Sequence, residues 1–199
     1  PSLDKSGKEL VFSVPSGNFG NICAGMVARE MGLPVSHFIA ATNANKVVPN
    51  FMKNGTYKAE KSVATISNAM DVGDPSNFVR ILQMHENEHG ILEKGFSAYI
   101  FSDQQTKEAM RAIKKEHHYT TDPHGAVGYL GLLEYQKNHP STYGVFLETA
   151  HPVKFLEVVE ETLGKTLTIP HKIVEVLSKQ KQATKISDYQ GLKRFLMQE

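Results

Sequence analysis

A strand, a glycine-containing turn and a helix follow one another without a gap near the start of the chain. The apolar run at residues 10–14 is typical of a buried strand, and residues 22–31 have the composition of a buried helix. The turn between them contains two glycines, which allow the backbone to bend sharply and to approach a ligand. Because the first N–H groups of a helix lack intrahelical partners, such a turn can bind a phosphate. The expected phosphate-binding residues are Gly17, Asn18, Phe19, Gly20 and Asn21.

This turn differs from the common nucleotide-binding motifs. No Gly-Lys-Ser/Thr follows the glycines, so it is not a nucleotide P-loop. Gly17 and Gly20 also lack the G-x-G-x-x-G spacing of the dinucleotide fingerprint. The alternative at this point is an ordinary strand-to-helix turn in which Asn and Gly serve the backbone alone.

The alternation of strands and helices continues along the chain. Apolar runs typical of buried strands occupy residues 36–41, 98–101 and 143–147, and residues 62–66 could form another short strand. Segments with helical character occupy residues 46–53, 77–87, 104–116, 124–138, 153–163, 170–179 and 188–197. This order predicts an α/β fold with a mostly parallel open sheet and flanking helices. Ligands bind such sheets beyond the carboxyl ends of the strands, where we expect residues 16–21, 42–45, 102–103 and 148–151.

Composition limits the classes of protein that the chain can represent. With 199 residues, 40% of them hydrophobic, it can form one domain, which we divide into an α/β portion at 1–163 and a helical tail at 164–199 packed on it. A formal charge of +1 does not favour a nucleic-acid or anionic-membrane partner. One cysteine excludes an internal disulfide, and neither a membrane-spanning run nor a signal peptide is evident. A cytoplasmic location is therefore expected.

One short motif competes with the phosphate site. His85-Glu86-Asn87-Glu88-His89 matches the H-E-x-x-H pattern of zinc hydrolases, in which two histidines one helical turn apart bind zinc and the glutamate acts as a base. The motif lies in a polar turn just before Gly90, and no third-ligand pattern follows. We expect no metal here and keep the zinc hydrolase as an alternative from a different class. Cys23 is expected to be buried, and His117, His118 and His124 to be at the surface.

Thr149 stands at the end of a predicted buried strand, on the expected ligand edge of the sheet. A hydroxyl there can hydrogen-bond a heteroaromatic nitrogen without imposing a charge. The alternative is that Thr149 caps the helix predicted from residue 153.

Several motifs together resemble a known family. The run Val14-Pro15-Ser16-Gly17-Asn18-Phe19-Gly20-Asn21 resembles the cofactor-phosphate loop of the threonine synthases, which are fold-type II enzymes dependent on pyridoxal 5′-phosphate. Four further stretches match in order and spacing: residues 41–45, 67–71 together with 76–78, 122–127 and 149–155. The resemblance implies the large domain of a tryptophan synthase β-like fold, and it is weakest after residue 163.

The resemblance also implies roles for particular residues. Gly17, Asn18, Phe19, Gly20 and Asn21 would hold the cofactor phosphate, and Thr149 would hydrogen-bond the pyridine nitrogen. The implied reaction converts O-phospho-L-homoserine and water to L-threonine and phosphate. Asn43, Asn45 and Asp71 would lie near the active face without an assigned role. A lyase or dehydratase of the same fold type, acting on other amino acids, is the alternative within pyridoxal chemistry.

One feature of the family is not found in this sequence. The family's Schiff-base lysine lies well upstream in a Phe-Lys-Asp-like context, and no lysine here has that context. We therefore expect no catalytic lysine in this chain, which resembles the C-terminal portion of the enzyme and would need the N-terminal part as its partner. Without that part, an exposed sheet edge would favour self-association. A non-catalytic phosphate-binding domain is the remaining alternative.

Overall fold

The computed structural model describes residues 7–177 and 179–197. The chain divides into two compact units, Pro1–Leu167 and Thr168–Glu199. The first unit contains the sheet and the predicted site. Each unit is described by itself below.

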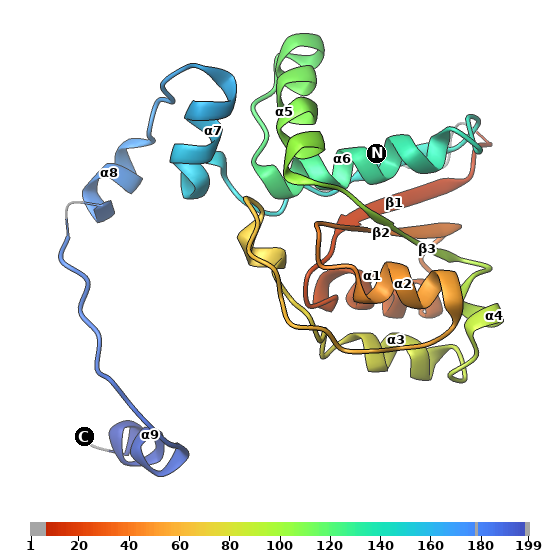
Figure 1. The fold of residues 1–199 in the computed structure, drawn as a ribbon, viewed down its shortest axis with the longest axis horizontal. Coiled ribbons are helices and arrows are strands. Elements are labelled where there is room, and N and C mark those ends of the chain that lie inside the picture. The colour runs from red at the N-terminus through yellow and green to blue at the C-terminus, as the bar shows by residue number, and fades with distance from the viewer. Residues whose placement is uncertain (1–6, 178, 198–199) are drawn as a thin grey trace. The chain divides into compact units, whose positions relative to one another are not determined.

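Four parallel strands form the sheet of the first unit (Figure 1). They are β1 (Leu10–Pro15), β2 (His37–Thr42), β3 (Phe96–Ile100) and β4 (Tyr143–Phe146), in the spatial order β3-β2-β1-β4. Ser13 of β1 pairs with Ile39 of β2 on one side and with Phe146 of β4 on the other. The predicted parallel sheet is thus confirmed.

The prediction of a short strand at residues 62–66 is wrong. The backbone N–H groups of this segment bind side chains instead of a neighbouring strand. Val63 N–H donates to Asn45 Oδ1 at 2.8 Å, and Thr65 N–H donates to Asp71 Oδ2 at 2.9 Å. β-Branched residues favoured the strand locally, but no partner strand lies beside them.

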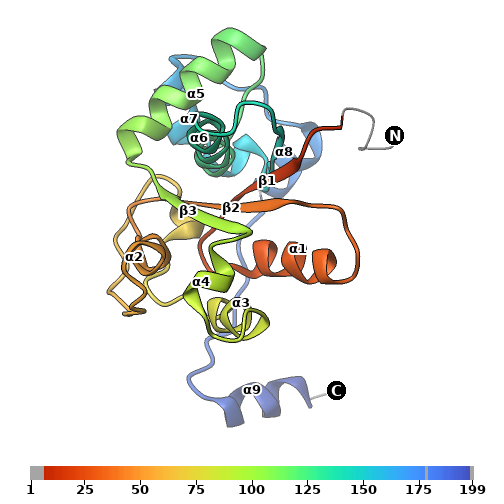
Figure 2. The same cartoon turned by 90° about the vertical axis from the view of Figure 1, so that its right-hand side faces the viewer.

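Helices cover both faces of the sheet (Figure 2). One face carries α1 (Gly20–Glu30), α2 (Val47–Asn54), α3 (Phe78–Met84) and α4 (His89–Leu92). The other carries α5 (Asp103–His117) and α6 (Pro123–Gln136), with α7 (Leu156–Leu163) against α5. Two 3₁₀ turns, Asn68–Met70 and Pro152–Phe155, complete this unit.

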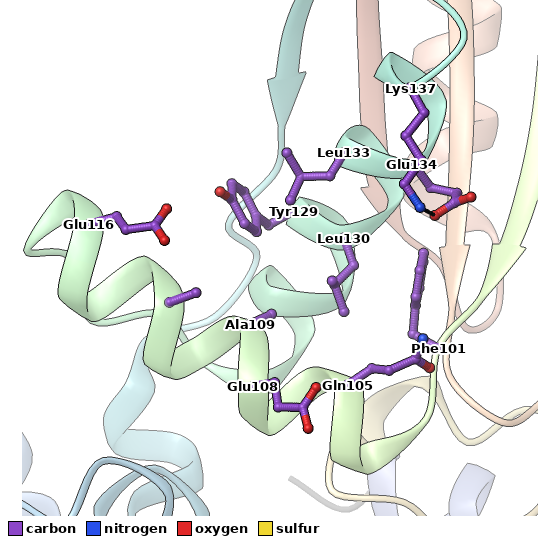
Figure 3. Close-up of a pocket in the computed structure, with 11 residues that line it drawn as sticks. Phe101, Gln105, Glu108, Ala109, Glu116, Tyr129, Leu130, Leu133, Glu134 and Lys137 are labelled. Atoms are coloured by element: carbon purple, nitrogen blue, oxygen red, sulfur yellow. Dashed lines mark hydrogen bonds and ion pairs between the residues drawn. The ribbon is translucent and has the colours of Figure 1, made fainter.

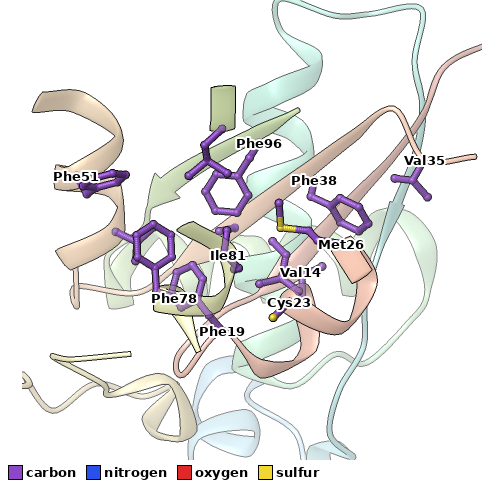
Figure 4. Packing of buried hydrophobic residues seen from close by; sticks show 14 of the residues in the cluster. Val14, Phe19, Cys23, Met26, Val35, Phe38, Phe51, Phe78, Ile81 and Phe96 are labelled. Atoms are coloured by element: carbon purple, nitrogen blue, oxygen red, sulfur yellow. The ribbon is translucent and has the colours of Figure 1, made fainter. Parts of the chain in front are cut away.

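The core follows the alternation of side chains along the strands. Val14 and Phe38 point toward α1 and α3, whereas Val11 and Ile39 belong to the cluster with α6 on the other face. The larger cluster is centred on Phe78, which is fully buried and meets the rings of Phe19 and Phe51 edge to face at 5.6 and 5.4 Å (Figure 4). Burying one such ring contributes about 1.5–3 kcal/mol, so this cluster is a main support of the fold.

The helix expected over residues 77–87 is shorter than predicted. It ends at Met84 because Glu86 and Asn87 adopt left-handed backbone conformations, with φ of 56° and 60°. A non-glycine residue in this region rarely continues a helix. A separate short helix, α4, follows. Asn77 directly precedes α3, and its side chain does not cap the helix.

The second unit contains two helices in its described residues, α8 (His171–Leu177) and α9 (Tyr189–Leu196). Asp188 caps α9 by accepting a hydrogen bond from Gly191 N–H at 2.6 Å. The end of the helix predicted at 170–179 includes residue 178, which lies outside the described residues. The packing of 164–199 on the α/β portion stays a prediction. None of the helices in the described residues has the length and apolar character needed to cross a membrane.

Candidate cofactor site

The order of the strands marks one position in the sheet as a ligand site. From β1 the chain passes through α1 to β2 on one side, whereas β4 lies on the other side of β1 and is reached through α5 and α6. The helix after β1 therefore covers one face of the sheet, and the helix before β4 covers the other. Between β1 and β4 the strand order reverses, and open α/β sheets bind ligands at such a point. Leu147 N–H donates to Ser13 O at 3.0 Å, which keeps the two strands in register to their carboxyl ends.

The turn after β1 presents backbone donors at the start of α1. The first intrahelical bond of α1 joins Cys23 N–H to Phe19 O at 3.0 Å, so the N–H groups of Gly20 and Asn21 precede the helical hydrogen bonds. Both residues are exposed. Phe19 takes the left-handed conformation before the helix, with φ 60° and ψ 14°, and its side chain is buried in the core. The buried ring thus anchors the turn, and only the Phe19 backbone can face a ligand.

Gly17 allows a close approach between two segments. A Cβ on Gly17 would lie 2.6 Å from Met70 Cα and 3.1 Å from Ala69 O, so any side chain would displace the turn at residues 68–70. The turn at residues 68–70 therefore packs directly against residues 17–21, which we call the phosphate loop.

Asn18 braces the loop through its side chain. Its Oδ1 accepts hydrogen bonds from Ser76 N–H at 2.7 Å and from the Ser76 hydroxyl at 3.1 Å. The Asn18 carbonyl also accepts from Asn77 Nδ2 at 2.9 Å. The Asn18 side chain thus holds the segment before α3, and a phosphate contact from this residue would come from its N–H group.

Asn43, Asn45 and Asp71 form a hydrogen-bonded network after β2. Asn43 Nδ2 donates to Asp71 Oδ1 at 2.8 Å, and Asn43 Oδ1 accepts from Asn45 Nδ2 at 2.8 Å. Thr65 donates to Asp71 through both its N–H, at 2.9 Å, and its hydroxyl, at 2.7 Å. These side chains bind one another and hold residues 63–71 against the end of β2.

Thr149 lies three residues beyond the end of β4 and is exposed. Within residues 7–177 and 179–197, its hydroxyl has no hydrogen-bond partner. The alternative role as a helix cap belongs to His151, whose Nδ1 accepts from Val153 N–H at 3.2 Å. Thr149 follows β4 and the phosphate loop follows β1, and these two strands are paired.

A buried polar cluster beside Thr149 was not expected from the sequence. The prediction that His124 lies at the surface is wrong, because its side chain is only 3% exposed. Its Nδ1 lies 2.6 Å from Asp122 Oδ1, and Asp122 is fully buried. Glu148 accepts hydrogen bonds from the Thr121 hydroxyl at 2.9 Å and from Asp122 N–H at 3.2 Å. The sequence Asp122-Pro123 at the start of α6 is typical of a helix cap. No local sequence pattern, however, predicts that Glu148 contacts this cap.

The two carboxyl groups of this cluster differ in acidity. Burial, together with the neighbouring Asp122, raises the pKa of Glu148 to about 7. Burial alone would raise the pKa of Asp122 as well, but hydrogen bonds from His124 and Glu148 outweigh it and lower that pKa. Of the two carboxyl groups, Asp122 is therefore the stronger acid and Glu148 the one that is protonated more readily.

The H-E-x-x-H motif does not form a metal site. His85 directly follows α3 and His89 starts α4, with two left-handed residues between them. The ring of His85 is buried and binds Ile81 O at 2.8 Å through Nδ1, whereas His89 Nε2 binds Met52 O at 2.9 Å. No cluster of potential metal ligands occurs among the residues that the structure describes. Cys23 is buried as expected, and burial raises its pKa.

A hollow of about 430 Å³ between α5 and α6 is a poor phosphate site (Figure 3). The lining residues that carry a charge at neutral pH are Glu108, Glu116, Glu134 and Lys137. The ammonium group of Lys137 is already bound to Glu134 at 2.6 Å. The remaining carboxylates would repel a phosphate, so the first turn of α1 is the better anion site.

The fold and this site define a class of protein. The family model described as "Pyridoxal-phosphate dependent enzyme" matches residues 5–147, and the chain belongs to that family. Within it, a second model, described as "Threonine synthase, C-terminal", matches residues 125–196. The resemblance to the threonine synthases is thereby confirmed, as is the α/β fold of the fold-type II enzymes.

Individual relatives agree with this assignment. The threonine synthase of Escherichia coli is 46% identical over 168 residues, which cover 84% of this chain and 38% of that protein. Its crystal structure superposes with a TM-score of 0.84 at 40% identity, covering 96% of this chain and 44% of the other. The structure of pyridoxal-phosphate-bound threonine synthase from Brucella melitensis gives a TM-score of 0.86 at 26% identity, covering 98% and 47%. The chain thus spans less than half the length of these relatives.

Proposed function

We propose that this chain is the cofactor-binding part of a threonine synthase, which converts O-phospho-L-homoserine and water to L-threonine and phosphate. The carrying observation is the placement of the 17–21 turn and Thr149 at the carboxyl ends of two paired strands, β1 and β4. Neighbouring strands lie about 4.8 Å apart. One small ring bearing a phosphate can therefore reach both segments.

The residues present fit pyridoxal phosphate. The N–H groups of Gly20 and Asn21 would hold the cofactor phosphate, supported by the dipole of α1. Gly17 would keep the backbone close to the ligand, and the Asn18 and Phe19 side chains would hold the turn in shape. The free Thr149 hydroxyl would donate a hydrogen bond to the pyridine nitrogen.

The chain's own contribution to the reaction would be positioning. Pyridoxal phosphate, when bound, supplies a conjugated system that withdraws electrons from an attached amino acid. Thr149 is a neutral partner, so it would leave the ring nitrogen unprotonated, in contrast to an aspartate. The residues that bind the phosphate of the substrate are expected upstream of this chain, as is the lysine that carries the cofactor. A cytoplasmic location agrees with a single free cysteine, Cys23.

Product analysis tests this function. The full-length protein, supplied with pyridoxal phosphate and O-phospho-L-homoserine, should release phosphate and form threonine in equal amounts. The 199-residue chain alone should release none. Deamination of serine or threonine, without turnover of phosphohomoserine, would instead favour the lyase or dehydratase alternative.

A further inference from the structure

A continuous set of buried and partly buried contacts joins the two ends of the proposed cofactor site. It begins at Glu148, the residue directly before Thr149. The Glu148 carboxyl is fixed by the Thr121 hydroxyl at 2.9 Å and by Asp122 N–H at 3.2 Å. A Cβ on Gly125 would lie 1.9 Å from Glu148 Oε2, so the start of α6 leaves space for this carboxyl only because residue 125 is glycine.

Asp122 connects Glu148 to His124. Its Oδ1 accepts from His124 N–H at 2.8 Å and from His124 Nδ1 at 2.6 Å. Its Oδ2 is buried and, within the described part of the chain, accepts no hydrogen bond from an N–H or hydroxyl group. A buried carboxylate oxygen without a donor is costly. Burial and the neighbouring Asp122 raise the pKa of Glu148 to about 7, so below that pH a protonated Glu148 would be a donor beside this oxygen.

His124 carries the connection to the phosphate loop. Ala69 N–H donates to His124 Nε2 at 3.2 Å, so Nε2 acts as an acceptor and Nδ1 is the nitrogen that donates to Asp122. The ring of Phe155 packs on His124 with 4.5 Å between centroids. Ala69 and Met70 in turn form the surface against which Gly17 lies.

We propose that Glu148, Asp122 and His124 are positioning residues that hold Thr149 and the phosphate loop at a fixed separation for the cofactor. This inference rests on the proposed function. It assigns a purpose to a carboxyl pair, with Asp122 buried and Glu148 partly buried, that has no place in the chemistry described above. Ionisation of Glu148 should loosen the connection, because a second carboxylate would then lie beside Asp122 in a partly buried space.

Other ionisable groups near this pair are few. Asp122 faces Glu148 directly, His124 lies beyond Asp122, and Tyr119 lies close enough to interact electrostatically with both carboxyl groups. Tyr119 stays protonated near neutral pH because burial and both carboxyl groups raise its pKa. Glu148→Gln removes this carboxyl alone, so a pH dependence of cofactor binding that the variant loses reports on Glu148.

The test measures the affinity of the full-length protein for pyridoxal phosphate as a function of pH, by absorbance titration. Wild type should lose affinity about tenfold as the pH rises through about 7. Glu148→Gln carries a permanent amide donor for Asp122 and should bind with the wild-type affinity of low pH throughout. Glu134→Gln, near the C-terminal end of α6 where residue 134 pairs with Lys137, is the matched control and should follow wild type. Titration of the cofactor itself is common to all three proteins, so the difference between Glu148→Gln and wild type reports on the carboxyl.

A second variant examines the other end of the connection. His124→Asn cannot reach Ala69 and should weaken pyridoxal phosphate about tenfold at low pH, with a smaller loss for pyridoxal, which has no phosphate. Identical pH profiles for Glu148→Gln and wild type would overturn the inference. Failure of wild type to bind the cofactor at any pH would overturn the proposed function and, with it, this inference.

Discussion

Position 17 requires glycine, because the backbone of Met70 occupies the place that a Cβ would need. Its neighbours have different tasks: the Phe19 ring is buried against Phe78, and the Asn18 amide holds Ser76. Only Gly20 and Asn21 present exposed backbone donors at the helix start. At this scale, most residues of the phosphate loop shape the loop rather than contact a ligand through their side chains.

Adding one methyl group at Gly17 should therefore disturb the loop. Gly17→Ala places a Cβ 2.6 Å from the Met70 backbone, which must move to accommodate it. We expect the free energy of unfolding to fall by about 1–3 kcal/mol, measured by urea denaturation of the full-length protein. Gly90→Ala is the control, because a Cβ there meets no atom within 4 Å. Equal stability of the two variants would contradict the close packing at Gly17.

Elements with local signals were predictable from the sequence. The helix α5 begins at Asp103 after Ser102, whose hydroxyl accepts from Gln105 N–H in a reciprocal capping box. The apolar runs of the four strands and the placement of Thr149 beside the glycine turn followed from strand alternation and the parallel-sheet rule. Contacts between distant residues were not predictable. The left-handed break at Glu86 and the burial of His124 against Asp122 depend on tertiary packing that a single sequence does not display.

The contact between Glu148 and the start of α6 should make stability depend on pH. Glu148 has a pKa of about 7 in the folded state and an ordinary value of 4.5. Its contribution is therefore complete below 4.5 and is lost as the pH rises to about 7, since the unfolded chain releases the proton earlier. Asp122, with its lowered pKa, acts in the opposite sense and only at more acidic pH.

Denaturation at the two ends of this pH interval measures the effect. The wild-type free energy of unfolding should fall more steeply than that of Glu148→Gln, which has no proton to lose. Glu134→Gln should follow wild type. A Glu148→Gln slope as steep as that of wild type would show that this carboxyl does not titrate with folding.

At the scale of the whole molecule, β4 ends the sheet. Among the described strands it pairs only with β1, and Tyr143 on it is 45% exposed. Nearby, Leu33 and Leu147 line an apolar hollow of about 110 Å³. An unpaired edge beside apolar surface favours association. The relatives are more than twice as long, and we infer that their remaining part covers this edge.

The 199-residue chain alone should therefore associate. Light scattering should give a mass above the 22.1 kDa of the monomer, and co-expression with the upstream part should remove that association. A chain that stays monomeric and folded by itself would contradict the role assigned to the β4 edge.

The central claim is that the first turn of α1 holds the phosphate of pyridoxal phosphate. Asn21→Asp tests it, because an acidic residue at a helix start favours the helix but repels a phosphate. The measurement compares the affinities of the full-length variant and wild type for pyridoxal phosphate and for pyridoxal. Asn138→Asp is the control for charge, because residue 138 is exposed and lies just after the C-terminal end of α6. We predict a loss of about tenfold for pyridoxal phosphate alone; an equal loss for both ligands, or none for either, would contradict the claim.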